Sequence, residues 1–366
     1  MRKMIFIGII ILGTAVYMFR TTFIDKSKSI KKLDIMVFSP NYESLNGILY
    51  KYSEENNIKI NLEEAQYFNF TSAFKEKSKK NEKIPDIFLV VNDWIGDLVE
   101  KNLIEEVKKE NLNELSKIAV ESIKYKNRYY GYPFKEETLF LFYNPKYIKK
   151  VPNKISDLLI LSKKIKEKYG IEGMVFPTDE YYYHFPWYSY VGGDVKELIN
   201  ISDKTLNNME KEMKIIKNNF KYMNSNLATT LFKDDKAAMM INGPWSIDYL
   251  KGVNYKIKTI KDEKFKPFVG IKTFVIYKKS KEKVEAEKLL KYLIGKDIQE
   301  KWSKDPKFIS VNKNVKNSMK NGIIMPNSPK LNRFWMESNK MIYDILKNSL
   351  DIKKSIKKNL IKEKIQ

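Results

Sequence analysis

The sequence predicts an α/β fold in which helices flank β-sheets and the chain is shared between two lobes. Apolar runs of strand length alternate with segments whose apolar residues recur every three or four positions, which is helical spacing. A length of 366 residues corresponds to about two domains. No Pro/Gly-rich linker or internal repeat separates the halves. We therefore expect two lobes that exchange chain segments and bind a ligand at strand ends.

The first part of the body predicts a β-α-β unit. Residues 33–38 form an apolar run of strand length, and apolar residues alternate with polar ones over 58–62. Between these strands, one helical face carries four apolar residues: Leu45, Ile48, Leu49 and Tyr52. A second helix is expected over 70–77, followed by a fully apolar strand at Ile87–Val91.

The remaining chain repeats the alternation of strands and helices. We expect a hairpin over 123–134 with Asn127 near its turn, and a helix capped by Ser156 or Asp157 that ends before Gly170. A lysine-rich amphipathic stretch at the C-terminus is expected to be an outer helix, with membrane contact as the alternative. The other predicted elements are strands at 138–143, 174–176, 237–241 and 271–277, and helices at 205–220, 282–294 and from Ser328 onward.

The N-terminus predicts export. Arg2 and Lys3 precede an uncharged, mostly apolar run over 4–19, and Arg20 ends it. The run is long for a signal peptide and short for a membrane-spanning helix. Both a cleaved signal and a retained anchor are therefore open, and we assign residues 1–32 to this segment.

Composition excludes several chemistries. The chain has no cysteine and a single histidine, His184, which excludes disulfides, thiol nucleophiles and multi-histidine metal sites. His184 stands among aromatic residues, where a packed ring is expected rather than a catalytic base. Only four of the 68 basic residues are arginines, so we interpret the net charge of +23 as a solvated surface and expect no nucleic-acid partner. No glycine-rich phosphate loop and no GxSxG elbow occurs.

Carboxylates and aromatic rings gather in a few loops. Asp93 and Trp94 follow the strand at Ile87–Val91, where Asp93 either faces a ligand cleft or caps a helix. Glu136 and Glu137 precede another strand, and one of them is expected to face the cleft. In the run EYYYHFPWYSY (180–190), one helix cannot bury every ring on one side, so some rings are expected to be exposed. Trp245 follows a further strand.

Several segments together carry a family resemblance. The chain resembles the maltose/maltodextrin-binding proteins of bacterial ABC sugar importers, a family of extracellular solute-binding proteins, over about residues 33–366. The segments are AAMMINGPW (237–245), GIIMPNSPKLNRFW (322–335), KPFVGI (266–271), EYYYHFPWYSYVGG (180–193), PDIF with Asp93 (85–93) and YYGYPF-EE-TLFLFYN (129–144).

The resemblance implies a periplasmic-binding-protein type II fold with mixed sheets flanked by helices and a hinged cleft between lobes. It implies an N-terminal lobe formed by 33–136 and 274–315 and a C-terminal lobe formed by 137–273 and 316–366. The chain would cross between lobes near 135–138, 268–274 and 315. Its partners would be an oligosaccharide and the importer's permease subunits, with no cofactor, no metal and no catalytic residue. We expect a periplasmic or extracytoplasmic monomer, tethered where the N-terminal segment stays uncleaved.

The resemblance also implies the ligand-binding residues. It places the carboxylates of Asp93, Glu137 and Glu180 on sugar hydroxyls, and the rings of Tyr182, Trp245 and Trp335 on glucose units, with Met325 beside them. Tyr42 and Glu43 stand where the family has an Asp-Lys pair, Val90 where it has a stacking tryptophan, Trp94 and Asn339 where it has arginines, and Met336 where it has a tyrosine.

These substitutions suggest a cleft that keeps its acids and loses its basic partners. A polyhydroxyl ligand is the first hypothesis, and a cationic ligand such as a polyamine or an amino sugar is the alternative. A glycoside hydrolase that uses Glu137 and Glu180 as acid and base is a further alternative. A surface protein that holds an anionic polymer on its basic face is the last.

Overall fold

A computed structural model describes residues 20–22, 31–38, 42–65, 77, 83–315 and 322–361. The chain divides into two compact units, Met1–Pro85 and Asp86–Gln366. The apolar run at 4–19, on which the expected signal or anchor depends, lies outside the described residues. No described helix is both long enough and apolar enough to cross a membrane.

The first unit contains the predicted β-α-β arrangement. Strand β2 (Lys31–Phe38) runs parallel to β3 (Ile58–Ala65), and helix α1 (Tyr42–Asn56) connects them. Its apolar face is buried as the spacing predicts, and it packs on β3. Strand β1 (Arg20–Thr22) pairs antiparallel with β3. The helix expected over 70–77 lies outside the described residues except for Lys77.

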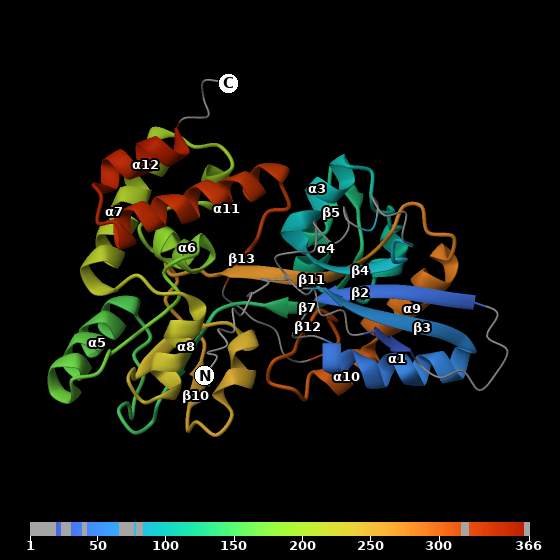
Figure 1. Cartoon of the computed structure of the whole chain (residues 1–366), viewed down its shortest axis with the longest axis horizontal. Helices are drawn as coiled ribbons and strands as arrows, with labels where there is room; N and C mark the ends of the chain where they lie inside the picture. Colours follow the sequence, from blue (N-terminus) through green and yellow to red (C-terminus); the bar gives the residue numbers. More distant parts are fainter. Residues whose placement is uncertain are drawn as a thin grey trace, which may run out of the picture. The chain divides into compact units, whose positions relative to one another are not determined.

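The second unit is organised around one long strand, β11 (Phe268–Ile276). It pairs antiparallel with β4 (Ile87–Val91) on one side and with β7 (Tyr132–Glu137) on the other (Figure 1). Strand β12 (Ile309–Ser310) extends this sheet beyond β7. The first residues of β11 also pair in parallel with β13 (Ile323–Ile324). The long strand therefore connects the sheet to the chain segment that leads into the C-terminal helices.

A glycine permits the close packing at the start of β7. Gly131 has a positive φ of 94°, and a Cβ at this position would lie 2.6 Å from Cγ2 of Thr273 on β11. A side chain there would collide with the neighbouring strand. Helix α9 (Lys283–Ile294) packs on β7 and β11, and α10 (Lys296–Trp302) packs on α9.

A smaller sheet, in the order β10-β8-β9, has its own core. Its strands are β8 (Phe140–Tyr143), β9 (Met239–Asn242) and β10 (Lys256–Lys258). Leu141 of β8 packs in a cluster with residues of helix α5 (Ile155–Tyr169). Helix α8 (Ser225–Lys233) packs on β9.

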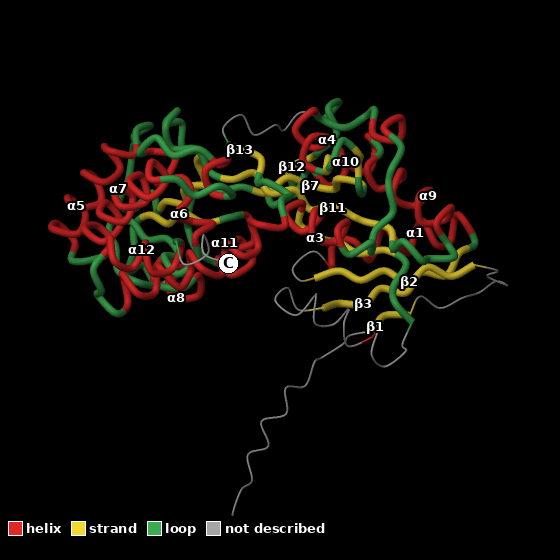
Figure 2. Tube along the Cα trace, turned by 90° about the horizontal axis from the view of Figure 1, so that it is seen from above, coloured by secondary structure: helices red, strands yellow, loops and turns green. Residues whose placement is uncertain are grey.

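Four helices, α6, α7, α11 and α12, pack together in the second unit (Figure 2). Helix α6 contacts α7 and α11, and α12 contacts the same two helices. The buried Ile356 and Leu360 of α12 face this bundle, as expected of an outer helix. Their bounds are α6 (Tyr181–Tyr190), α7 (Asp203–Asn219), α11 (Pro329–Ile342) and α12 (Ile352–Leu360).

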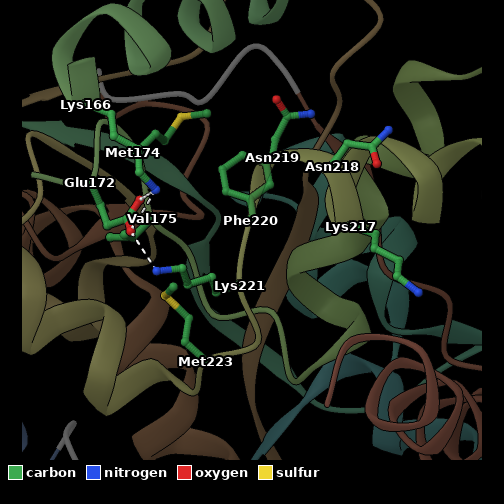
Figure 3. A pocket seen from close by; sticks show the side chains of 10 residues that line it. All are labelled: Lys166, Glu172, Met174, Val175, Lys217, Asn218, Asn219, Phe220, Lys221 and Met223. Atoms are coloured by element: carbon green, nitrogen blue, oxygen red, sulfur yellow. Dashed lines mark hydrogen bonds and ion pairs between the residues drawn. The ribbon is translucent and has the colours of Figure 1, made fainter. Parts of the chain in front are cut away.

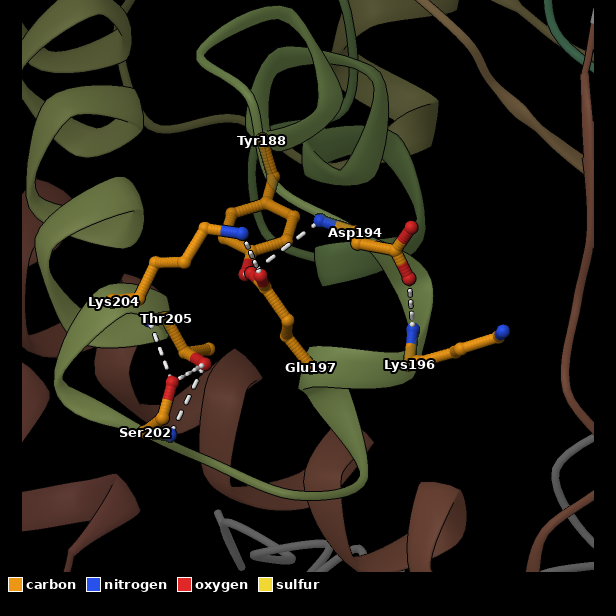
Figure 4. Close-up of polar contacts among 7 residues, drawn as sticks. All are labelled: Tyr188, Asp194, Lys196, Glu197, Ser202, Lys204 and Thr205. Atoms are coloured by element: carbon orange, nitrogen blue, oxygen red, sulfur yellow. Dashed lines mark hydrogen bonds and ion pairs between the residues drawn. The ribbon is translucent and has the colours of Figure 1, made fainter.

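A polar network fastens the end of α6 to the chain that leads into α7 (Figure 4). The hydroxyl of Tyr188 donates to Oε2 of Glu197 at 2.6 Å, and Nζ of Lys204 donates to its Oε1 at 2.6 Å. Ser202 and Thr205 form a capping box at the start of α7. These bonds fix the orientation of α6, whose first turn carries two of the predicted binding residues.

The elements mostly follow the sequence prediction, with a few differences. The hairpin at 123–134 contains β5 and β6, with Lys126 and Asn127 at positive φ in its turn. Helix α5 ends at Tyr169, just before Gly170, as predicted. The expected N-cap is wrong, because Lys154 is the N-cap and the Ile155 amide donates to Asp262. Residues 174–176 form a single bridge rather than a strand. The remaining elements are η2 (Asn92–Trp94), α3 (Ile95–Glu100), η3 (Lys109–Leu112), α4 (Lys117–Ser122), β5 (Lys124–Tyr125), β6 (Arg128–Tyr129), η4 (Val195–Leu198), η5 (Pro244–Leu250) and the π-helical turn η6 (Tyr343–Lys347).

Candidate functional site

The buried Asn92 brings three distant segments together at the end of β4. Its Oδ1 accepts the amide hydrogen of Ile271 at 2.9 Å, and its Nδ2 donates to the carbonyl oxygen of Met325 at 2.6 Å. Ile271 lies on β11, and Met325 precedes α11. The side chain of Met325 is buried.

Asp93, the next residue, has a buried carboxylate. Its Oδ2 accepts a hydrogen bond from Nε1 of Trp335 at 3.2 Å, and its Oδ1 has no hydrogen-bond partner within the described part of the chain. Burial raises the pKa of Asp93 to about 6, although the Trp335 bond and the charge of Lys272 oppose this rise. Neither η2 nor α3 has a side-chain cap, so the capping alternative for Asp93 is not found.

Aromatic rings form a continuous row that ends near Asp93. The ring of Trp245 lies 5.9 Å from that of Tyr182, and Tyr182 lies 6.1 Å from Phe268. Phe268 in turn lies 5.8 Å from Trp335. Tyr182, Trp245 and Trp335 are each half-buried, whereas Phe268 is fully buried. The structure therefore joins the three predicted stacking rings through Phe268, which was not singled out in the sequence as a binding residue.

Glu137, at the end of β7, is held by two lysines. Nζ of Lys135 lies 2.7 Å from its Oε1, and Nζ of Lys272 lies 3.3 Å from its Oε2. Burial opposes ionisation of Glu137, but the two ammonium groups outweigh it and hold its pKa below the usual value. The hypothesis that the acids of the site lack basic partners is therefore wrong for Glu137. Both lysines come from strand positions whose local pattern gives no sign of this pairing.

Glu136 has different surroundings from its neighbour. Successive side chains of a strand point to opposite faces, which separates Glu136 from Glu137. The carboxylate of Glu136 accepts a long hydrogen bond, 3.4 Å, from Oγ of Ser116. Burial raises the pKa of Glu136 to about 7, which the Ser116 bond opposes.

The first turn of α6 contributes a second carboxylate. Glu180 precedes the helix and is half-buried, and burial together with the neighbouring Asp179 raises its pKa to about 7. The amide of Tyr181 donates to Oδ1 of Asn339 on α11 at 2.8 Å. Asn339 thus anchors this turn to α11 rather than serving as a basic contact.

The expectation that some rings in the run at 180–190 are exposed holds only in part, because none of them is fully exposed. Tyr182 and Tyr190 are half-buried, and the other rings of α6 are buried. The reason is that α6 is covered on more than one side, by α7, α11 and β11. A helix in the middle of a bundle can bury rings around its circumference.

His184 is a packed ring, as predicted. It is fully buried, with Nδ1 3.0 Å from Oε1 of Glu212 and Nε2 3.1 Å from the carbonyl oxygen of Thr178. The Tyr181 hydroxyl donates to Oε2 of Glu212 at 3.0 Å. This buried network supports the turn that carries Glu180 and Tyr182.

The remaining predicted residues lie in two places. Trp94 is half-buried at the end of η2, next to Asp93. Tyr42 and Glu43 begin α1 in the first unit, and their side chains lie outside the described part of the structure. Within the described residues, no group of acids and histidines is arranged to hold a metal ion.

A surface pocket of about 200 Å³ is separate from these residues (Figure 3). It lies between the ends of α5 and α7, where Lys166 and Lys221 pair with Glu172. None of the predicted binding residues lines it.

Comparison with solved structures confirms the predicted fold class. The Thermus thermophilus maltotriose binding protein bound with maltotriose matches with a TM-score of 0.77 and 21% identity, covering 90% of this chain and 98% of that chain. The maltose-binding periplasmic protein of Listeria monocytogenes matches with a TM-score of 0.73 and 23% identity, covering 90% and 96%. The fold is thus the two-lobed α/β fold with helix-flanked mixed sheets.

Sequence relatives cover most of the chain. The maltotriose-binding protein of Pyrococcus abyssi is 27% identical over 320 residues, 75% of this chain and 69% of that protein. The maltodextrin-binding protein MdxE of Bacillus subtilis is 26% identical over 378 residues, 92% and 90%. The galactooligosaccharide-binding protein of Bacillus subtilis is 24% identical, covering 90% and 89%. Residues 48–327 match the model of the bacterial extracellular solute-binding proteins, and the chain belongs to that family.

Proposed function

We propose that this protein binds a maltodextrin-like oligosaccharide outside the cytoplasm and delivers it to the permease of an ABC importer. The proposal is supported by membership of the extracellular solute-binding family and by relatives whose names include maltotriose, maltodextrin and maltooligosaccharide binding. The proposal also states that the protein is a monomer and not an enzyme. It further states that the protein is exported and that it stays tethered to the membrane where residues 1–32 are retained.

The single observation that carries the proposal is the row of rings that ends at Asp93. Half-buried aromatic rings offer flat apolar surfaces to the CH faces of sugars. The Asp93 carboxylate keeps one buried oxygen without a hydrogen-bond partner among the described residues, and a sugar hydroxyl can donate to it. Rings beside a buried acceptor fit a neutral polyhydroxyl ligand.

The proposed binding residues are those implied by the resemblance. The carboxylates would accept hydroxyl hydrogens, the rings would stack, and closure of the two lobes around the ligand would signal the permease. The set comprises Tyr42, Glu43, Asp93, Trp94, Glu137, Glu180, Tyr182, Trp245, Met325 and Trp335. The proposed lobes comprise 33–136 with 274–315, and 137–273 with 316–366.

Titration calorimetry of the full-length chain tests the proposal. Maltotriose and maltotetraose should bind with one site each and raise the thermal midpoint, because a ligand that binds only the folded state stabilises it. A galactooligosaccharide and spermidine serve as comparison ligands. If spermidine binds and no maltooligosaccharide binds, the sugar proposal is overturned. Release of reducing ends from maltotetraose would identify a hydrolase instead.

A further inference from the structure

Two buried lysines contact Glu137, one of the carboxylates of the candidate site. Lys135 on β7 and Lys272 on β11 are paired across the two strands, and both are more than 90% buried. Lysines are seldom buried to this extent unless they are paired with an acid. The interpretation of the lysines as a solvated surface therefore does not account for these two buried residues.

Glu137 accounts for the proximity of the two ammonium groups. Lys135 and Glu137 are two residues apart on one strand, so their side chains share a face. Each carboxylate oxygen faces a different ammonium, at 2.7 Å from Lys135 and 3.3 Å from Lys272. One acid cannot neutralise two cations, so this trio carries a net positive charge when all three groups are ionised.

Asp93 supplies the second negative charge. Lys272 pairs through its backbone with Val91, two positions before Asp93, and its charge stabilises the ionised form of Asp93. Asp93, Lys272, Glu137 and Lys135 therefore form a buried series of two acids and two bases. Their formal charges cancel when all four groups are ionised.

We propose that Lys135 and Lys272 set the charge selectivity of the ligand site, so that it accepts uncharged ligands and rejects cations. This inference rests on the proposed binding of a sugar by Asp93 and Glu137. An acidic site without these lysines would attract a polyamine or an amino sugar. With them, a cationic ligand would meet two ammonium groups in a medium that screens charge poorly. A neutral sugar hydroxyl meets no such repulsion and can donate to the carboxylates.

The test compares a neutral and a cationic ligand on lysine variants of the full-length chain. Lys272→Met and Lys135→Met keep most of the side-chain volume and remove the charge. Lys256→Met, at an exposed lysine on β10, is the matched control. We expect both buried variants to bind spermidine at pH 7.5 at least tenfold more tightly, relative to maltotriose, than the wild type and the control do. An unchanged ratio in folded protein would overturn the proposal.

A variant that removes a negative charge tests the proposal independently, in case the methionine variants do not fold. Glu137→Gln removes one negative charge and keeps the shape of the side chain. Its affinity for maltobionate, an anionic disaccharide, should rise at least tenfold relative to maltotriose, whereas an unchanged ratio would contradict the inference. Circular dichroism and the thermal midpoint check that each variant is folded. Failure of the wild type to bind maltotriose would overturn the proposed function. The affinities for spermidine and maltobionate relative to maltotriose test the charge selectivity separately.

Discussion

The indole nitrogen of Trp335 donates a hydrogen bond to Asp93 across 3.2 Å, although 242 positions separate the two residues in the chain. The bond joins a ring on α11 to a carboxylate at the end of β4. One side of Trp335 also faces Phe268, which continues the row toward Tyr182 and Trp245. This hydrogen bond thus joins a proposed stacking ring, Trp335, to a proposed acceptor of sugar hydroxyls, Asp93.

Removal of either terminal ring should weaken sugar binding. Trp335→Ala and Trp245→Ala should each lower maltotriose affinity by about 1–3 kcal/mol, because large aromatic anchors dominate such sites. Met336→Ala and Tyr249→Ala, at exposed neighbours on the same helices, are the matched controls and should bind normally. Calorimetry measures all four. Unchanged affinity in both tryptophan variants would show that the ligand does not stack on this row.

Gly243 should determine the position of the Trp245 ring. A Cβ at this position would lie 2.2 Å from ring atoms of Trp245, so Gly243→Ala must displace the ring. The backbone of Gly243 has φ of −92°, which alanine adopts without strain. We therefore expect weaker maltotriose binding with a nearly unchanged thermal midpoint. Gly47→Ala, where a Cβ meets nothing within 4 Å, is the control that should leave affinity unchanged.

Sugar affinity should depend on pH through Asp93. Its pKa of about 6 means that it becomes protonated as the pH falls through 6, and a protonated carboxyl loses acceptor capacity. Between pH 8 and pH 5 protonation of Asp93 should by itself lower the maltotriose affinity by about tenfold. In Asp93→Asn this transition near pH 6 should disappear, while a transition near the Glu180 pKa of about 7 should remain. Identical pH profiles for wild type and variant would contradict the assignment.

Glu136 should destabilise the fold at alkaline pH. Its folded-state pKa, about 7, is above the ordinary value of 4.5, so the folded state binds its proton more tightly than the unfolded state does. Stability from this group is present at low pH and is lost as the pH rises through the window from 4.5 to about 7. Glu136→Gln should therefore raise the free energy of unfolding at pH 8 by roughly 3 kcal/mol at most. Urea denaturation at pH 8 and pH 4.5 should show the gain only at pH 8.

Loss of the buried partner of His184 should be costly. Glu212→Ala leaves Nδ1 of His184 and the Tyr181 hydroxyl without their present partner. Leaving a buried polar group without a hydrogen-bond partner costs about 1–3 kcal/mol of folding stability for each group. Glu210→Ala on the same helix breaks a partly exposed pair with Lys214 and should cost less than about 1 kcal/mol. Equal effects in urea denaturation would show that the His184 network contributes little.

Much of the site was predictable from local residue patterns. Asp93, Trp94 and Trp245 follow strands whose apolar runs are visible in the sequence, and the strand at Ile87–Val91 has the predicted bounds. The hairpin turn at Asn127 was predictable because asparagine tolerates positive φ. The assignment of individual side chains to ligand contacts remains a prediction.

The burial of α6 and the lysine pair were not predictable in this way. Periodicity shows how many rings one helix carries, but the number of neighbours that cover the helix is a property of the assembled bundle. The local sequence does not distinguish Lys135 and Lys272 from the many other lysines of the chain, since nothing in it indicates burial.

The order of apolar runs and turn residues was sufficient to determine the α/β class and the loops that carry rings and acids, because these depend on interactions within a few residues. The tertiary structure alone decided which charges meet. The contacts of Glu137 with Lys272 and of Asp93 with Trp335 join segments more than a hundred residues apart. Their energies come from distance and burial, which no local pattern encodes.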